Sequence, residues 1–136
     1  MRPLRWRSVR FQRPGYDQPA RAYTNIGIAY LNKGALAEAV EHFRKAVDYQ
    51  ANIPEVHHNL GITYAGLGRR AEAIRAFREA IRFRPSYVDA HFGLGNVLLT
   101  EGRKEEARLA FERVIALAPD SSIATESREQ LKSLTP

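Results

Sequence analysis

Histidines are the side chains of this sequence most suited to metal chemistry. A zinc site needs three or four ligands that converge at about 2 Å on one point, and the sequence has four histidines and no cysteine. His57 and His91 are 34 residues apart, so we expect them to occupy the same place in two successive structural units. No carboxylates cluster with them in the sequence. We therefore predict a packing role for both histidines, with no metal and no other cofactor.

The candidates for acid, base or nucleophilic catalysis have simpler structural interpretations. Glu105 and Glu106 are adjacent on a predicted helix and point in different directions, so they do not form an acid and base pair. Ser121 and Ser122 stand at a predicted helix start, where serine ordinarily caps the helix. There is no cysteine thiol, and the glycine-containing stretches lack the pattern of a phosphate loop. We expect a protein that is not an enzyme.

The elements that carry these residues repeat every 34 residues along the chain. Each copy has a glycine inside an apolar pattern, followed at fixed distances by a second glycine, an alanine and a phenylalanine. In order, these are Gly27, Gly61 and Gly95, then Gly34, Gly68 and Gly102, then Ala39, Ala73 and Ala107, then Phe43, Phe77 and Phe111. A period of this length predicts stacked pairs of helices, and such solenoids bind partners rather than catalyse.

The apolar spacing within each copy favours helices over strands. Tyr23, Ile26, Gly27 and Tyr30 recur at intervals of three and four, which places them on one helical face. A glycine there costs roughly 1 kcal/mol relative to alanine, and this is explained if the missing side chain lets the second helix approach closely. Gly34 is expected to end the first helix with a positive φ.

These landmarks resemble the tetratricopeptide repeat family across residues 20–121. The resemblance implies an all-α protein, a right-handed α-solenoid of three helix-turn-helix units with a C-terminal capping helix. We expect a basic N-terminal tail at 1–19, units at 20–53, 54–87 and 88–121, and the capping helix at 122–136.

A second resemblance is to the repeat region of bacterial lipoproteins for type IV pilus biogenesis and stability, through the segments YDQPARAY and FERVIALAPDS. It implies a role in envelope or pilus assembly. The sequence lacks the signal and anchoring cysteine of a lipoprotein, and no apolar run approaches the roughly 18 residues of a membrane span. As it stands it predicts a cytoplasmic protein, or a periplasmic or envelope protein if an upstream signal precedes it.

In the family, the first helix of each unit lines a concave groove, and the resemblance implies which residues face a ligand. We expect an apolar floor formed by Ile28, Leu31, Ile62, Phe92 and Leu99. The polar positions are Arg21, Thr24, Glu55, His58, Asp89 and Asn96. Such a groove suits an amphipathic helix or an extended peptide of another protein. The alternative is that some of these residues pack between helices or against the N-terminal segment.

One branch of the family holds the C-terminal carboxylate of chaperones with two lysines, two asparagines and an arginine. The matching positions here hold Thr24, Ile28, Asn59, Asp89 and Gly93. Only Asn59 agrees with that pattern, so the sequence argues against a receptor for chaperone tails.

The net charge of +6 is concentrated at the N-terminus. Residues 1–19 carry five arginines against Asp17 alone, which leaves +2 for the other 117 residues. The arginines interleave with Leu4, Trp6, Val9 and Phe11. This tail could bind nucleic acid or an anionic surface, lie across the first unit as a cap, or be a start-site artefact. The first helix of the first unit could pack against another copy of the chain if the tail does not cover it.

Arginines also gather on the second helix of the second unit, as Arg75, Arg78 and Arg82, with Arg69, Arg70 and Arg84 nearby. We expect this stripe to face outward on the convex side. Glu72 and Glu79 offer it local ion pairs. The stripe is then either solvated or in contact with an anionic partner.

Overall fold

Seven α-helices make up the part of the chain that the structure, a computed structural model, describes, which is residues 18–134. They are α2 (Pro19–Asn32), α3 (Leu36–Tyr49), α4 (Pro54–Gly66), α5 (Arg70–Phe83), α6 (Val88–Thr100), α7 (Lys104–Leu117) and α8 (Ser122–Leu134). No strand occurs within these described residues. The predicted all-α fold is therefore confirmed.

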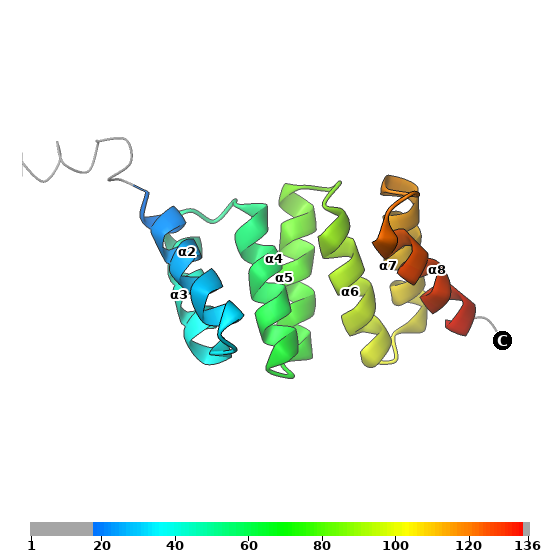
Figure 1. Cartoon of the computed structure of the whole chain (residues 1–136), viewed down its shortest axis with the longest axis horizontal. Coiled ribbons are helices and arrows are strands. Elements are labelled where there is room, and N and C mark those ends of the chain that lie inside the picture. Colours follow the sequence, from blue (N-terminus) through cyan, green and yellow to red (C-terminus); the bar gives the residue numbers. More distant parts are fainter. Residues whose placement is uncertain (1–17, 135–136) are drawn as a thin grey trace, which may run out of the picture.

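The helices pair in sequence order, and the pairs stack into a solenoid that runs from α2 (blue) to α8 (red) (Figure 1). Within the pairs, α2 packs on α3, α4 on α5, and α6 on α7. Between the pairs, α3 contacts α4 and α5 contacts α6. The last helix, α8, packs on α7 and also touches α6. Each pair thus buries its apolar surface against its neighbours, as in other helical repeat arrays.

The array bends so that the first helices of the pairs lie on its inner side. These helices contact one another in succession, α2 with α4, α4 with α6, and α6 with α8. The second helices α3, α5 and α7, all within the described residues, make no such contacts with each other. Elements that lie closer together occupy the shorter, concave side of a curved stack. The concave face is therefore built from α2, α4 and α6.

Glycines with positive φ end the first helix of each pair. Gly34, Gly68 and Gly102 have φ angles of 80°, 77° and 78°. In the first pair, the backbone N–H of Ala35 donates to the carbonyl of Tyr30 at 2.9 Å, which closes the end of α2. The equivalent bonds run from Arg69 to Tyr64 and from Arg103 to Leu98. The predicted turn role of these glycines is confirmed.

The repeated phenylalanines lie at the centre of the core, where Phe43, Phe77 and Phe111 are at most 2% exposed. Each ring lies on the helical glycine of its own pair. A Cβ atom on Gly27 would stand 2.6 Å from the Phe43 ring, well inside the roughly 3.5–4.0 Å of a carbon contact. The same distance is 2.7 Å for Gly61 with Phe77 and 2.8 Å for Gly95 with Phe111. These glycines admit a whole aromatic ring from the second helix.

Candidate functional site

The predicted floor residues lie on the helices of the inner side and are only partly covered. Ile62 on α4 is 40% exposed. The other four predicted floor residues are half-buried and pack against the core: Ile28, Leu31, Phe92 and Leu99. All five come from α2, α4 and α6, the helices of the inner side. The predicted floor residues therefore keep apolar surface that a ligand could cover.

The floor rests on the buried phenylalanines. The ring of Phe92 meets Phe111 edge-on, with 6.1 Å between ring centroids. The ring of His58 is tilted by 58° against that of Phe77, with 5.7 Å between the centroids. Because both phenylalanines are almost wholly buried, they hold the side chains above them in defined positions. A ligand would meet a surface that is already formed.

A polar cluster stands where α4 begins and α5 ends. Arg84 donates a hydrogen bond through Nη2 to the carboxylate of Glu55, and its guanidinium lies 4.8 Å from the ring centroid of Tyr87. Tyr87 in turn stacks at a tilt on His58, 4.9 Å between centroids. Glu55 and His58 were predicted from the sequence, whereas Arg84 and Tyr87 were not assigned to the groove. Arg84 had been assigned to the convex stripe.

Burial sets the protonation of this cluster. It lowers the pKa of His58 below its ordinary value of 6.5, and the charges of Asp89 and Glu55 oppose this only partly. Burial also raises the pKa of Tyr87. For Glu55, burial acts to raise the pKa, but the hydrogen bond and charge of Arg84 outweigh it and the pKa is lowered. At neutral pH the cluster therefore holds a neutral imidazole beside an ion pair.

The remaining predicted polar residues differ in what they offer a ligand. Asp89 is exposed and forms no ion pair with any described residue. The hydroxyl of Thr24 already donates to the carbonyl of Ala20 at 2.7 Å, and Arg21 is exposed with only a 3.4 Å bond to Gln18. Asn96 is half-buried on α6. Asp89 is thus the charged position on this face that is most open to a partner.

The first pair has a hollow where the second has the polar cluster. The hollow has a volume of about 590 Å³ and is lined by Gln18, Pro19, Ala20, Arg21, Thr24, Asn25, Tyr49, Gln50 and Ile53. Its Arg21 and Thr24 are the counterparts of Glu55 and His58, 34 residues earlier. Tyr49, which the sequence did not indicate, is 61% exposed and stacks on Tyr23 at 5.7 Å. The structure therefore adds an aromatic wall beside two predicted residues.

His57 and His91 hold the loops that precede their helices. Their Nε2 atoms donate to the backbone carbonyls of Ala51 at 2.6 Å and Pro85 at 2.8 Å. Because a carbonyl can only accept, the proton resides on Nε2 in both rings. Both side chains are buried, at 8% and 7% exposure. Within residues 18–134, no three His, Asp or Glu side chains are grouped in a way that could hold a metal ion.

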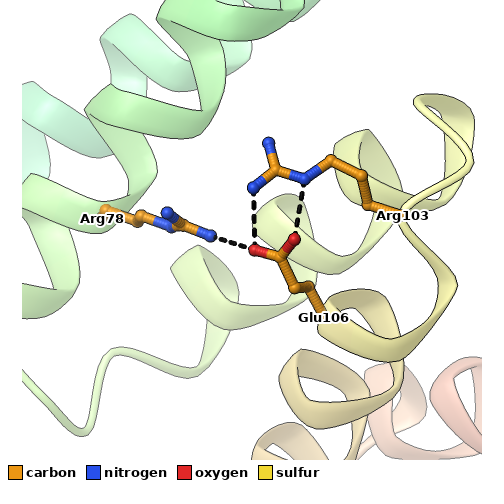
Figure 2. A network of polar contacts seen from close by, with 3 residues as sticks. All are labelled: Arg78, Arg103 and Glu106. Carbon is orange, nitrogen blue, oxygen red and sulfur yellow. Dashed lines mark hydrogen bonds and ion pairs between the residues drawn. The ribbon is translucent and has the colours of Figure 1, made fainter.

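Most of the arginines around the convex stripe are neutralised by carboxylates. The pairs are Arg69 with Glu72, Arg70 with Glu101, Arg78 with Glu106, Arg82 with Glu79, and Arg84 with Glu55. Arg75 has no ion-pair partner in the described part of the chain. Figure 2 shows how Glu106 accepts hydrogen bonds from both Arg78 and Arg103, which joins α5 to α7. Three of these six arginines, Arg70, Arg78 and Arg84, therefore pair with a carboxylate of another helix, whereas Arg69 and Arg82 pair locally.

The N-terminal tail at 1–19 lies outside the described residues, apart from Gln18 and Pro19. The nucleic-acid or anionic-surface role expected for it therefore stays a prediction. None of the described helices has the length and apolar character needed to span a membrane.

Two family models match the sequence, and both carry the description Tetratricopeptide repeat. One matches residues 20–86 and the other residues 58–122. No curated protein sequence matches the chain.

Solved structures with this fold are similar over most of the chain. The first TPR of Spaghetti (RPAP3), bound to the HSP90 peptide SRMEEVD, is 26% identical with a TM-score of 0.79, over 86% of this chain and 93% of that one. The Arabidopsis OM64 TPR domain is 17% identical with a TM-score of 0.81, over 85% and 96%, which shows the fold alone. MamA is 26% identical with a TM-score of 0.74, and the match covers 75% of this chain and 60% of the MamA chain.

Proposed function

The chain belongs to the tetratricopeptide repeat family, and we propose that it is a non-catalytic scaffold that binds a peptide or an amphipathic helix of another protein in its concave groove. The observation that carries the proposal is the partly exposed apolar floor, with Ile62 at 40% exposure and Phe92 held over a buried ring. The Spaghetti domain, which has the same fold, holds a peptide.

The charges of the groove favour a ligand that combines apolar side chains with a basic residue. Asp89 offers a carboxylate without an ion-pair partner among the described residues, whereas Glu55 is already engaged by Arg84. A lysine or arginine of the ligand gains more at Asp89, because at Glu55 it must compete with a bound guanidinium. The ligand's apolar side chains then cover the floor beside it.

The peptide bound by the Spaghetti domain ends in a carboxylate-rich tail, EEVD, and we propose that such a chaperone tail is not the partner of this chain. Asp89 is one of the five positions that match the carboxylate clamp of that branch, and it would repel a carboxylate placed there. Gly93 is another of these positions, where a Cβ atom would stand 2.5 Å from the Phe77 ring. A basic side chain at this position has no room at its base.

A finer form of the proposal places the scaffold in the bacterial envelope or in pilus assembly. Its support is the similarity of the YDQPARAY and FERVIALAPDS segments. The alternative function, binding of nucleic acid or an anionic surface, is supported by the five arginines of residues 1–19. It predicts an affinity that falls steeply with salt and is lost on deletion of residues 1–15, whereas groove binding by apolar contact survives both.

A displayed peptide library selected on the purified full chain tests the groove. Selected peptides are then measured by fluorescence anisotropy against the wild type, Ile62→Glu and Leu109→Glu. Leu109 on α7 is 63% exposed and lines a separate hollow that includes none of the predicted groove residues, so it is the matched control. We expect Ile62→Glu to weaken binding about tenfold or more, equivalent to about 1.4 kcal/mol, and Leu109→Glu to leave it unchanged.

Undiminished binding to a folded Ile62→Glu protein, checked by circular dichroism, would contradict the groove proposal. The same assay with SRMEEVD tests the partner class. We expect no saturable binding of this peptide to the wild type. Saturable binding with the same affinity in the wild type and in Asp89→Asn would overturn our exclusion of chaperone tails, because Asp89 would then not repel the peptide.

A further inference from the structure

The outer side of α2 is open, although the same positions are buried in the later pairs. Ile26 is 42% exposed, whereas its counterparts Leu60 and Leu94 are 6% and 8% exposed. Two more residues of α2 are exposed although their counterparts in the later pairs are buried. Ala22 corresponds to Val56 and Ala90, and Ala29 corresponds to Thr63 and Val97. We call Ala22, Ile26 and Ala29 the α2 end face. Its residues are apolar, as are their counterparts apart from Thr63, yet no described residue covers them to the same extent.

In the rest of the array, each first helix is covered by the segment that immediately precedes it in the chain. Helix α3 packs on α4, α5 packs on α6, and α7 packs on α8. The segment that precedes α2 is residues 1–17, which joins the described chain at Gln18. Counted by the 34-residue period, residues 2–15 stand to α2 as α3 stands to α4.

The apolar residues of this segment fall at positions that carry the core in α3. Trp6 and Val9 are the counterparts of Val40 and Phe43, which are 7% and 0% exposed. Arg5 and Gln12 replace the small residues Ala39 and Ala46, so the segment would cover the face less closely than α3 covers α4. Large apolar side chains are thus available where the end face needs them.

We propose that residues 1–17 cover the α2 end face, with Trp6 against Ile26. Chain length permits this contact, because the twelve residues from Trp6 to Gln18 reach up to about 40 Å when extended. Ile26 lies seven residues into α2, only about 10 Å from the start of the helix. Covalent attachment also gives the segment an effective concentration in the millimolar range, which a second copy in dilute solution does not match.

Trp6 is the single tryptophan of the chain, so its fluorescence reports on the segment without a label. We compare the full-length wild type with Ile26→Glu and with Ile62→Glu, whose isoleucines are 42% and 40% exposed on different faces. We expect a blue-shifted Trp6 emission and slow acrylamide quenching in the wild type and in Ile62→Glu. Ile26→Glu should shift the emission to the red and raise the quenching constant towards that of the urea-unfolded chain.

Three outcomes would overturn the proposal. The first is a wild-type Trp6 as accessible to acrylamide as in the unfolded chain. The second is protection that disappears on dilution, which assigns the face to a second copy. The third is loss of protection in Ile62→Glu with protection kept in Ile26→Glu, which places the segment in the concave groove. Circular dichroism checks the fold of each variant, and Ile26→Ala is the milder substitution to use if Ile26→Glu does not fold.

Discussion

The ring of Phe77 occupies the space that a side chain on Gly93 would need, although the two residues belong to different helix pairs. A Cβ atom on Gly93 would stand 2.5 Å from Cζ of Phe77. The same ring also lies against Gly61, where a Cβ atom would stand 2.7 Å from it. One buried ring is therefore held between glycines of α4 and α6, and it sets how closely the second and third pairs approach.

We expect Gly93→Ala to lower the free energy of unfolding by about 1–3 kcal/mol, the usual cost of overpacking a core. The loss should appear although alanine is the better helix former, because the Phe77 ring is only 2% exposed and also packs closely against Gly61, which leaves it little room to move. Urea denaturation followed by circular dichroism measures it. Gly66→Ala is the control, since its Cβ would meet only Cδ1 of Leu36 at 2.9 Å, the end of a side chain that can rotate. A Gly93→Ala protein as stable as Gly66→Ala would contradict this account.

His91→Phe should lower the free energy of unfolding by about 1 kcal/mol, the typical net value of one hydrogen bond. Phenylalanine keeps a ring in the buried site but cannot donate to the carbonyl of Pro85, which His91 reaches at 2.8 Å. His57→Phe should behave alike through the carbonyl of Ala51. Urea denaturation of both single variants and of the double variant checks this. Unchanged stability in both single variants would mean that these bonds hold neither loop.

The stability of the chain should fall as the pH drops below about 6.5, because of His58. Burial places its folded-state pKa below the ordinary value of 6.5, so the unfolded chain binds the proton more readily. The stabilisation is complete above that value and is lost as the pH falls towards the folded-state pKa. His58→Phe should flatten this part of the curve when unfolding is measured at about pH 7.5 and about pH 5.5. The pKa of Glu55 is lowered from 4.5, so this carboxyl group affects the stability only at pH values below about 4.5, outside the measured range. An equal slope in the variant would assign the effect elsewhere.

The order of the helices could be predicted from the sequence because the period repeats the residues that end and pack each helix. Gly34 and its counterparts turn the chain wherever they recur, and the phenylalanine of each second helix finds its glycine within the same pair. These relationships are local, so a one-dimensional pattern contains them.

The polar contacts of the candidate site could not be predicted, because they join residues of different helices that lie far apart in the sequence. Arg84 follows α5 yet binds Glu55 at the start of α4, and Arg78 of α5 reaches Glu106 of α7. A long arginine side chain has several carboxylates within reach, and the way the helices pack decides among them. An open first helix is expected from its place at the end of the array, but the sequence pattern itself does not distinguish exposed Ile26 from buried Leu60.

The carboxyl group of Glu106 should titrate below its ordinary value of 4.5, because hydrogen bonds from Arg103 and then Arg78 lower its pKa. Arg103 donates twice, at 2.8 Å each, and Arg78 once, at 2.7 Å. Arg103→Gln should therefore raise the titration midpoint of Glu106 more than Arg78→Gln does. Carbon-13 NMR of the side-chain carboxyl group measures this midpoint.

Since the folded-state pKa of Glu106 is the lower one, its ion pairs contribute stability above pH 4.5. This contribution is lost as the pH falls through the folded-state pKa. Because the group is exposed, high salt should reduce both shifts. A larger shift in Arg78→Gln than in Arg103→Gln would show that the contact between α5 and α7 dominates over the one at the start of α7.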